Sequence, residues 1–190
     1  MKIRRYVMYL SILIALVTIL WPSKYDRIMK PILEMKEKNP NLIFDGKPEP
    51  PFPDKKKNIE SITGIDVNKN GIRDDLEIYA NRVSKTELER KARIQHFIAL
   101  EELVKAVESK NIERIRLVDD FYAATRRCQY ETISKSNGYE VANREYDYSI
   151  ELFEIIQKNK NILDKISFIR AGEAQNANGV KDNVCSRDMR

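Results

Sequence analysis

Apolar residues recur at intervals of three and four along most of the chain beyond residue 70, which is the spacing of amphipathic helices. Nothing interrupts this pattern, because no proline follows Pro53 and no glycine lies between Gly71 and Gly138. The stripes comprise Leu76, Tyr79, Ala80 and Val83; then Leu88, Ala92, Phe97, Ala99, Leu103 and Val107; then Leu117, Phe121, Ala124 and Cys128; and then Ala142, Tyr146, Ser149, Phe153 and Ile156. Ile162, Leu163, Ile166 and Ile169 either extend the last helix or form a fifth.

Local signals indicate where these helices begin and end. Ser84 and Glu87 have the spacing of a capping box, so the second helix is expected to begin there. Gly138, with two polar residues before it, is expected to end the third. No segment alternates polar and apolar residues as a strand would. We therefore predict an all-α fold, with a bundle of about four or five helices over residues 58–171 and a polar, irregular tail over 172–190.

The amino terminus has the pattern of a targeting segment. Three basic residues, Lys2, Arg4 and Arg5, precede a sixteen-residue apolar run from Tyr6 to Trp21. A secretory signal has such an apolar core but ends in a small-x-small cleavage site, which is missing here. The run is just shorter than the about 17 to 25 residues that span a bilayer. We predict that residues 1–21 are an uncleaved signal anchor, a transmembrane helix in the inner membrane with a periplasmic or extracellular domain; the alternative is a signal peptide that is removed on secretion.

Prolines gather in the segment that follows. Five of the seven lie between Pro40 and Asp54, and each fixes φ and removes an amide donor. We therefore expect residues 22–57 to comprise a juxtamembrane segment, with a short helix over Tyr25 to Lys38, and an extended proline-rich linker. Such a linker would separate the membrane from the folded domain.

The charge distribution argues against nucleic acid as a partner. Removing Lys2, Arg4 and Arg5 from the formal net charge of +5 leaves +2 for the rest of the chain. The remaining basic residues are interspersed with acids, apart from Lys55 to Lys57, so no stripe that could follow a phosphate backbone is evident.

The two cysteines, Cys128 and Cys185, lie beyond the predicted anchor. An oxidising compartment would favour a disulfide between them, closing a long loop worth about 4 kcal/mol on the chain-entropy model. The alternative is a buried free thiol at Cys128 and an exposed one at Cys185. No CxxC pair is present, so neither a redox motif nor a zinc knuckle is indicated.

Residues of catalytic type are scarce. The single histidine, His96, lies inside a predicted helix with no nucleophile or metal-ligand spacing around it, so a structural or surface role is expected. Paired acids such as Glu101 and Glu102 are adjacent in sequence and point about 100° apart on a helix, so they cannot face one substrate. The sequence gives no positive sign of an enzyme.

The most informative segment is DVNKNGIRDDLE, from Asp66 to Glu77, because its oxygen-bearing side chains have the spacing of a twelve-residue calcium loop. The expected ligands are the side chains of Asp66, Asn68, Asn70 and Glu77, the main-chain carbonyl of Ile72, and Asp74 through a water molecule. Gly71 stands at the sharp turn. The alternative is a metal-free turn in which Asp74 and Glu77 cap the following helix. That alternative would not need Asp66 and Asn68 at alternate positions.

The segment resembles an EF-hand loop, and is more similar to the single calcium loops of bacterial dockerins and thrombospondin type 3 repeats. Its setting, GIDVNKNGIRDDLEIYANR, resembles that of small exported bacterial proteins. Arg73 stands where a sensor EF-hand has an apolar residue, and Gly64 stands where an entering helix would end, so a paired calcium sensor is not expected. A later echo, NANGVKD over 176–182, lacks the flanking acids and is expected to be a turn.

These observations predict an exported, membrane-tethered protein that binds one structural calcium ion and acts as a structural or interaction module, with an envelope protein as its partner. Three ligand carboxylates, Asp66, Asp74 and Glu77, predict an affinity of about 10⁻⁵ to 10⁻³ M. The alternative is an exported envelope hydrolase with a structural calcium ion and an active site that its sequence does not reveal.

Overall fold

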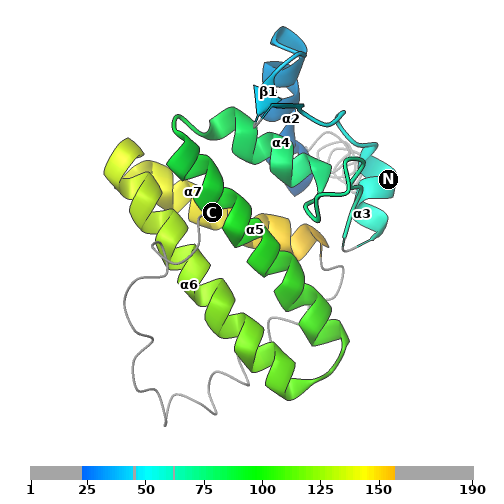
Figure 1. Ribbon diagram of the computed structural model, residues 1–190, viewed down its shortest axis with the longest axis vertical. Helices are drawn as coiled ribbons and strands as arrows, with labels where there is room; N and C mark the ends of the chain where they lie inside the picture. The colour runs from blue at the N-terminus through cyan, green and yellow to red at the C-terminus, as the bar shows by residue number, and fades with distance from the viewer. Residues whose placement is uncertain (1–22, 45, 62, 157–190) are drawn as a thin grey trace, which may run out of the picture.

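Six helices account for most of the part of the chain that the computed structural model describes, which is residues 23–44, 46–61 and 63–156 (Figure 1). The helices are α2 (Lys24–Lys38), α3 (Lys55–Glu60), α4 (Asp74–Val83), α5 (Glu87–Glu108), α6 (Ile112–Asn137) and α7 (Tyr139–Ile156). Two short antiparallel strands, β1 (Ile43–Phe44) and β2 (Lys47–Pro48), pair between α2 and α3. The prediction of a mostly helical domain is therefore confirmed for these residues.

Side-chain caps explain several helix ends. Thr86 accepts a hydrogen bond from the Glu89 amide at 3.2 Å, and the Glu89 carboxylate reaches back to the Lys85 amide at 3.0 Å. This capping pair starts α5, so the capping box predicted at Ser84 and Glu87 was wrong. Ser84 instead ends α4, where its hydroxyl donates to the Ala80 carbonyl. The end of α6 at Gly138 was predicted correctly, and that glycine has φ of +86°.

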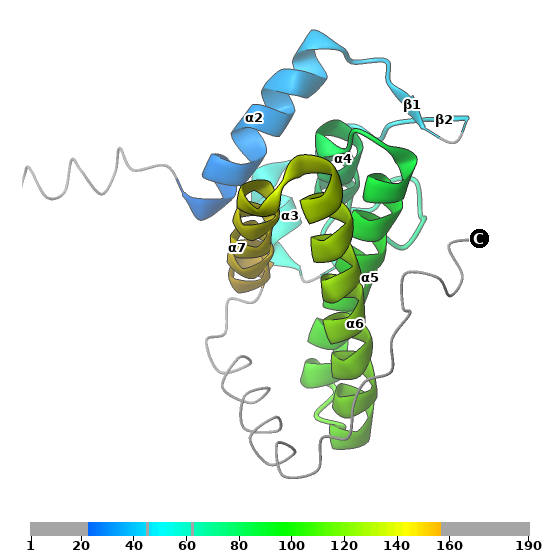
Figure 2. The same ribbon diagram turned by 90° about the vertical axis from the view of Figure 1, so that its left-hand side faces the viewer.

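Helices α5 and α6 lie side by side as a long antiparallel pair, and α7 crosses them near the end of the pair that includes the α6–α7 junction (Figures 1 and 2). Helix α2 packs against α4 and α7, at the opposite end of the molecule from the turn that joins α5 to α6. Two buried clusters result. One comprises Ala99, Leu100, Leu103, Val104, Ala106, Val107, Ile115 and Tyr122 between α5 and α6, and the other comprises Tyr25, Ile28, Met29, Ile32, Ile72, Leu76, Ile78, Tyr79, Ala80 and Phe97.

The segment predicted as a tether, residues 22–57, differs from that expectation within its described part. Four apolar side chains of α2, Tyr25, Ile28, Met29 and Ile32, belong to the core of the domain. In the proline-rich stretch, the carboxylate of Glu49 is buried and forms ion pairs with Lys36 and Arg82. The extended-linker prediction overlooked these long-range contacts, so the folded domain includes residues well before position 58.

The apolar stripe predicted on α6 is correct only at its carboxyl-terminal end. Cys128 is buried, whereas Leu117 is 74% exposed and Phe121 is 46% exposed. Among the described elements, helix α7 lies beside the later turns of α6 and not beside its first turns (Figure 2).

None of the described helices is long and apolar enough to cross a membrane. The predicted anchor over residues 1–21, the helix or extension around 162–169, and the polar tail over 172–190 all lie outside the described residues.

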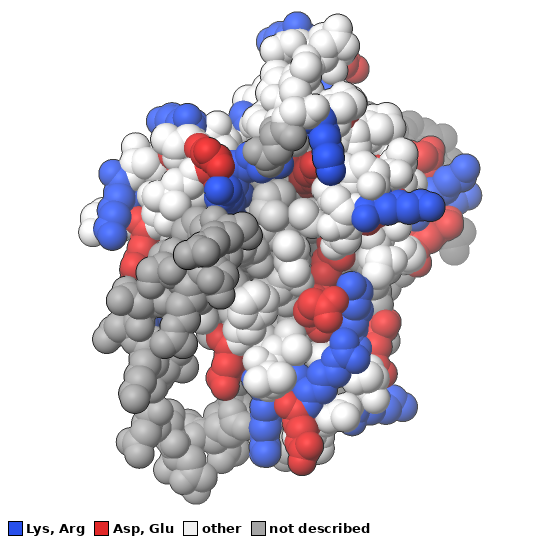
Figure 3. All heavy atoms as spheres, viewed as in Figure 1, with Lys and Arg blue, Asp and Glu red and all other residues white. Residues whose placement is uncertain are grey.

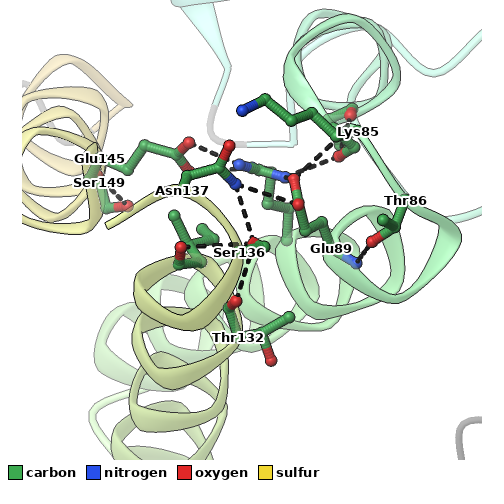
Figure 4. Close-up of polar contacts among 12 residues, drawn as sticks. Lys85, Thr86, Glu89, Thr132, Ser136, Asn137, Glu145 and Ser149 are labelled. Carbon is green, nitrogen blue, oxygen red and sulfur yellow. Dashed lines mark hydrogen bonds and ion pairs between the residues drawn. The ribbon is translucent and has the colours of Figure 1, made fainter. Parts of the chain in front are cut away.

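A buried ion-pair network joins α5, the end of α6 and α7 (Figure 4). Arg93 of α5 donates to the carboxylate of Glu145 at 2.9 Å and to that of Glu89 at 3.2 Å. Asn137 donates to the other oxygen of Glu89 at 3.0 Å, and Arg93 also donates to the Ser84 hydroxyl at 2.8 Å. Arg93, Glu89 and Glu145 are all buried, so each charge depends on its partners for the solvation it has lost.

We predict that Arg93→Ala lowers the free energy of unfolding by about 3 to 5 kcal/mol, because it leaves two buried carboxylates without their cation. Arg27→Ala is the matched control, since Arg27 forms one exposed ion pair with Glu151 of the same helix α7 and should cost at most about 1 kcal/mol. Urea unfolding followed by circular dichroism measures both. Equal effects of the two substitutions would contradict the account of the network.

We also predict that Met29→Ala costs about 2 to 5 kcal/mol, because the Met29 side chain is buried in the core. Met35→Ala is its control on the same helix, since Met35 is 45% exposed, and it should change stability by no more than about 0.5 kcal/mol. The same unfolding experiment applies. If α2 belonged to a tether outside the domain, both methionine variants would unfold like the wild type.

Candidate metal centre

The loop from Asp66 to Arg73 joins α3 to α4, and the remaining residues of the calcium-loop motif form the first turn of α4. Lys69 and Gly71 both have positive φ, of 55° and 84° respectively, which turns the chain back on itself. Glycine adopts this conformation without strain, so Gly71 occupies the sharp turn that the sequence predicted. The loop thus closes over about eight residues into a compact curl.

Alternate side chains of the loop point inward and bind main-chain amides of the loop itself. The Asp66 carboxylate accepts hydrogen bonds from the amides of Asn70 at 3.2 Å and Gly71 at 2.8 Å. The Asn68 side-chain oxygen accepts from the Asn70 amide at 3.1 Å, and the Asn70 side-chain oxygen accepts from the Ile72 amide at 3.0 Å. These side-chain to main-chain hydrogen bonds stabilise the curled loop, and they are formed by the oxygen-bearing residues that were predicted as ligands.

Glu77 closes the far side of the loop. Its carboxylate oxygen Oε2 accepts hydrogen bonds from the side-chain amides of Asn68 and Asn70, each at 2.9 Å. Position 12 of a calcium loop supplies the carboxylate that closes the coordination sphere. The structure therefore brings together the side chains of Asp66, Asn68, Asn70 and Glu77, as the sequence predicted.

Asp74 lies against the start of the same loop. Its carboxylate accepts from the Val67 amide at 3.1 and 3.2 Å, and its own amide donates to the Ile65 carbonyl at 2.8 Å. Burial, with smaller contributions from the negative charges of Asp66 and Glu77, raises the pKa of Asp74 to about 6. Three carboxylates thus share one small region and repel one another, which is a charge arrangement that a cation would relieve.

The position of these acids bears on the alternative of a metal-free capped turn. Arg73 is the N-cap residue of α4, and no side-chain hydrogen bond caps the helix at that position. Asp74 and Glu77 direct their carboxylates to Val67, Asn68 and Asn70 of the loop. Their hydrogen bonds therefore serve the loop, and the helix-capping interpretation does not account for them.

The donor set fits calcium in kind. Among the described residues, no three Asp, Glu, His or Cys side chains are grouped so that they could hold a metal by themselves. A site here depends on the amide oxygens of Asn68 and Asn70 and on a main-chain oxygen such as that of Ile72, which are ligands that calcium accepts and that softer metals disfavour. The two Asn amides direct their NH₂ groups toward Glu77, so metal binding would require them to turn their oxygens inward.

A second polar cluster, which the sequence did not predict, lies directly beneath the loop. Arg73 is 1% exposed and forms two hydrogen bonds with Asp75, from Nε at 3.1 Å and from its terminal nitrogen at 3.0 Å. Its main-chain amide donates to the Glu101 carboxylate at 3.2 Å, and burial raises the pKa of Glu101 to about 7. In the sequence, Arg73 stands out only as a departure from the EF-hand pattern. Its partner Glu101 is 28 residues away, a separation that no local spacing reveals.

His96 is fully buried between α5 and α6, with its ring centroid 5.1 Å from that of Tyr122. Neither ring nitrogen has a hydrogen-bond partner among the described residues. Burial lowers the pKa of His96 to about 3, so the ring is neutral at physiological pH. Its position agrees with the structural role predicted for it.

Cys128 is buried in α6, and no described cysteine is a free thiol. Its predicted partner, Cys185, lies outside the described residues, as does the stretch over 176–182. The disulfide therefore remains a prediction.

Comparisons of the chain with protein-family models, with curated proteins and with solved structures found no match. The resemblance to calcium loops accordingly depends on the residues of the loop and on their arrangement alone.

The raised pKa of Glu101 predicts a pH dependence of stability. The folded-state pKa of about 7 lies above the ordinary value of 4.5, so the folded chain binds this proton more tightly than the unfolded chain does. The group's contribution to stability is complete below about pH 4.5 and is lost as the pH rises to 7. Glu101→Gln, measured by urea unfolding without calcium between pH 4.5 and 7, should therefore flatten the decline in stability.

The neighbouring Glu102 supplies the control for this experiment. Hydrogen bonding to Lys105 lowers the pKa of Glu102, whereas burial raises that of Glu101. Glu102→Gln should leave the slope between pH 5 and 7 unchanged. A Glu101→Gln variant with the wild-type slope would contradict the assignment.

Proposed function

We propose that this chain is an exported, calcium-binding structural module, held at a membrane by its N-terminal segment. One calcium ion in the loop Asp66–Glu77 would fix the junction between the N-terminal part of the chain and the helical domain. The observation that carries the proposal is the closed curl in which Asp66, Asn68, Asn70 and Glu77 are joined by hydrogen bonds. The side chains of these residues, the Ile72 carbonyl, and Asp74 through a water molecule would be the ligands.

The electrostatics of the loop support a cation in particular. Asp74 and Glu77 are both buried, and burial, followed by the charges of Asp66 and Glu77, raises the pKa of Asp74. A buried carboxylate is costly unless a positive group compensates it. The basic residue adjacent to Asp74, Arg73, is already paired with Asp75. A divalent cation would supply the compensation that the loop needs.

The proposed location is extracytoplasmic. Free calcium outside the cytoplasm reaches the range of about 10⁻⁵ to 10⁻³ M that suits a site with three carboxylates. The basic and then apolar pattern of residues 1–21 supports export and attachment to a membrane. Basic and acidic side chains are interspersed on the face drawn in Figure 3, and we propose no nucleic-acid partner.

The exposed apolar residues of α6 support an interaction role. Leu117 and Phe121 lie one turn apart in the first half of α6, and both side chains are exposed. Large apolar side chains at such spacing are typical of a helix that contacts another protein. An envelope protein is the partner that the predicted location implies.

The proposal predicts that calcium raises the melting temperature of the full chain. At a calcium concentration one hundred times the dissociation constant, the stabilisation would be about 2.7 kcal/mol. For a domain of this size, such a change shifts the melting temperature by roughly 5 to 15 °C. Differential scanning calorimetry with calcium, and with magnesium as the competing ion, measures the shift.

The sharpest variant is Glu77→Gln, because glutamine can still accept the hydrogen bonds from Asn68 and Asn70 while the charge is lost. It should abolish the calcium-induced shift without preventing folding. Glu87→Gln is the control, since Glu87 is an exposed glutamate that pairs only with Lys91 among the contacts described here. A melting temperature that does not respond to calcium in the wild type would contradict the proposed function.

A further inference from the structure

Four elements of the fold meet at the carboxylate of Asp75, which is buried in the first turn of α4. Arg73 forms an ion pair with it from the end of the loop. The side-chain amide of Asn58, in α3, donates to its Oδ2 atom. The Tyr25 hydroxyl of α2 donates to the same atom at 3.1 Å. A single carboxylate thus joins the loop to two helices that precede it in the chain.

Asn58 also fastens the start of the loop. Its side-chain oxygen accepts a hydrogen bond from the Ile65 amide at 2.8 Å, one residue before the first expected ligand. Gly64 has φ of +57°, and a Cβ atom at this position would lie 2.7 Å from both the Asn58 oxygen and Arg73 Nε. The chain therefore passes between Asn58 and Arg73 with no room for a side chain. Both ends of the loop are held by the same buried group of residues.

This arrangement takes the place of the entering helix that an EF-hand loop has and this loop lacks. An EF-hand loop is positioned by a helix on each side, whereas here only α4 follows directly. Asn58 holds the start of the loop, and Arg73 with Asp75 holds its end. Tyr25 contacts the residues that hold both ends of the loop, because Tyr25 and Asn58 donate to the same oxygen of Asp75. Helix α2, 50 residues before Asp75, thereby becomes part of the frame of the loop.

We propose that Tyr25, Asn58 and Asp75 couple the calcium loop to helix α2, so that calcium binding and the docking of α2 strengthen each other. These three are positioning residues, since none of them is an expected ligand. The inference rests on the proposed calcium site and adds that calcium at this site strengthens the docking of α2. Because coupling between two equilibria is reciprocal, loss of the α2 contact must weaken calcium binding by the factor with which calcium strengthens the docking of α2.

The coupling has a consequence for the whole chain. Helix α2 begins at Lys24, three residues after the predicted anchor ends. Calcium would therefore set how firmly the segment next to the membrane is held against the helical domain. A chain that lost calcium would retain α5, α6 and α7 and would loosen at α2, the helix next in sequence to the predicted anchor.

Hydrogen exchange measured by mass spectrometry on the full chain tests one direction of the coupling. Calcium should slow exchange in α2 by about fivefold or more. It should slow exchange less at the turn between α5 and α6, which lies at the opposite end of the molecule from α2 (Figure 1). Glu77→Gln should remove both effects. Equal slowing at the two sites would overturn the proposal, because it would indicate general stabilisation only.

Calorimetric titration with calcium tests the other direction. Tyr25→Phe removes only the hydroxyl that donates to Asp75 and keeps the buried ring, so the chain should fold. It should raise the calcium dissociation constant by about fivefold. Tyr130→Phe is the matched control, because it removes a hydroxyl that donates to Asn143, between α6 and α7 and away from the loop. The control should change the dissociation constant by less than about twofold.

The outcomes separate this inference from the function on which it rests. Wild-type calcium affinity in Tyr25→Phe, with no effect of calcium on exchange in α2, would overturn the coupling and leave the calcium site intact. Absence of calcium binding to the wild type and to Tyr130→Phe would overturn the site, and the coupling with it. Asn58→Ala provides a second variant. It should weaken calcium binding at least as much as Tyr25→Phe does, since Asn58 contacts both Ile65 before the loop and Asp75 after Arg73.

Discussion

The burial of acidic side chains at the start of α4 is the constraint on which the rest of the structure depends. Asp74, Asp75 and Glu77 all lie in the first helical turn and are all buried. A helix N-terminus favours negative charge, but by no more than about 2 kcal/mol, which is less than the cost of burying several carboxylates. Asp75 is compensated by Arg73 within the protein. Asp74 and Glu77, with Asp66 beside them, have main-chain and amide donors but no comparable ion pair among the contacts described, and this difference is the physical basis for a cation.

The same constraint explains why the N-terminal part of the chain folds onto the domain. The ion pair of Arg73 and Asp75 is buried, and the polar groups of Tyr25 and Asn58 complete its hydrogen bonding. A comparable arrangement recurs at Glu49, whose buried carboxylate binds Lys36 and Arg82 and holds the proline-rich segment in place. Buried charge with dedicated partners specifies a single arrangement, because any other one leaves a charge unpaired.

Local features of this structure could be predicted from the sequence, and features that join distant residues could not. The loop residues lie within twelve positions, so their spacing alone predicted the curl and the convergence on Glu77. The helices were predicted from apolar periodicity, and the stop at Gly138 from its conformational freedom.

Asn58 gave no signal in the sequence. It follows three lysines, in a segment whose composition is typical of a solvent-exposed surface, and its partners are up to 33 residues away. The prolines before it predicted an extended chain, since proline content describes the backbone and not the surface to which the backbone binds. Leu117 and Phe121 show the converse error, because amphipathic spacing identifies an apolar face without indicating what covers it.

The central claim is that the loop from Asp66 to Glu77 binds one calcium ion through charge as well as shape. Isothermal titration calorimetry of the full chain with calcium, beside the Glu77→Gln variant, tests this claim most directly. The account predicts a single site with a dissociation constant between about 10⁻⁵ and 10⁻³ M in the wild type and no saturable binding in the variant. Absence of binding to the wild type at millimolar calcium, or equal binding by the two proteins, would contradict it.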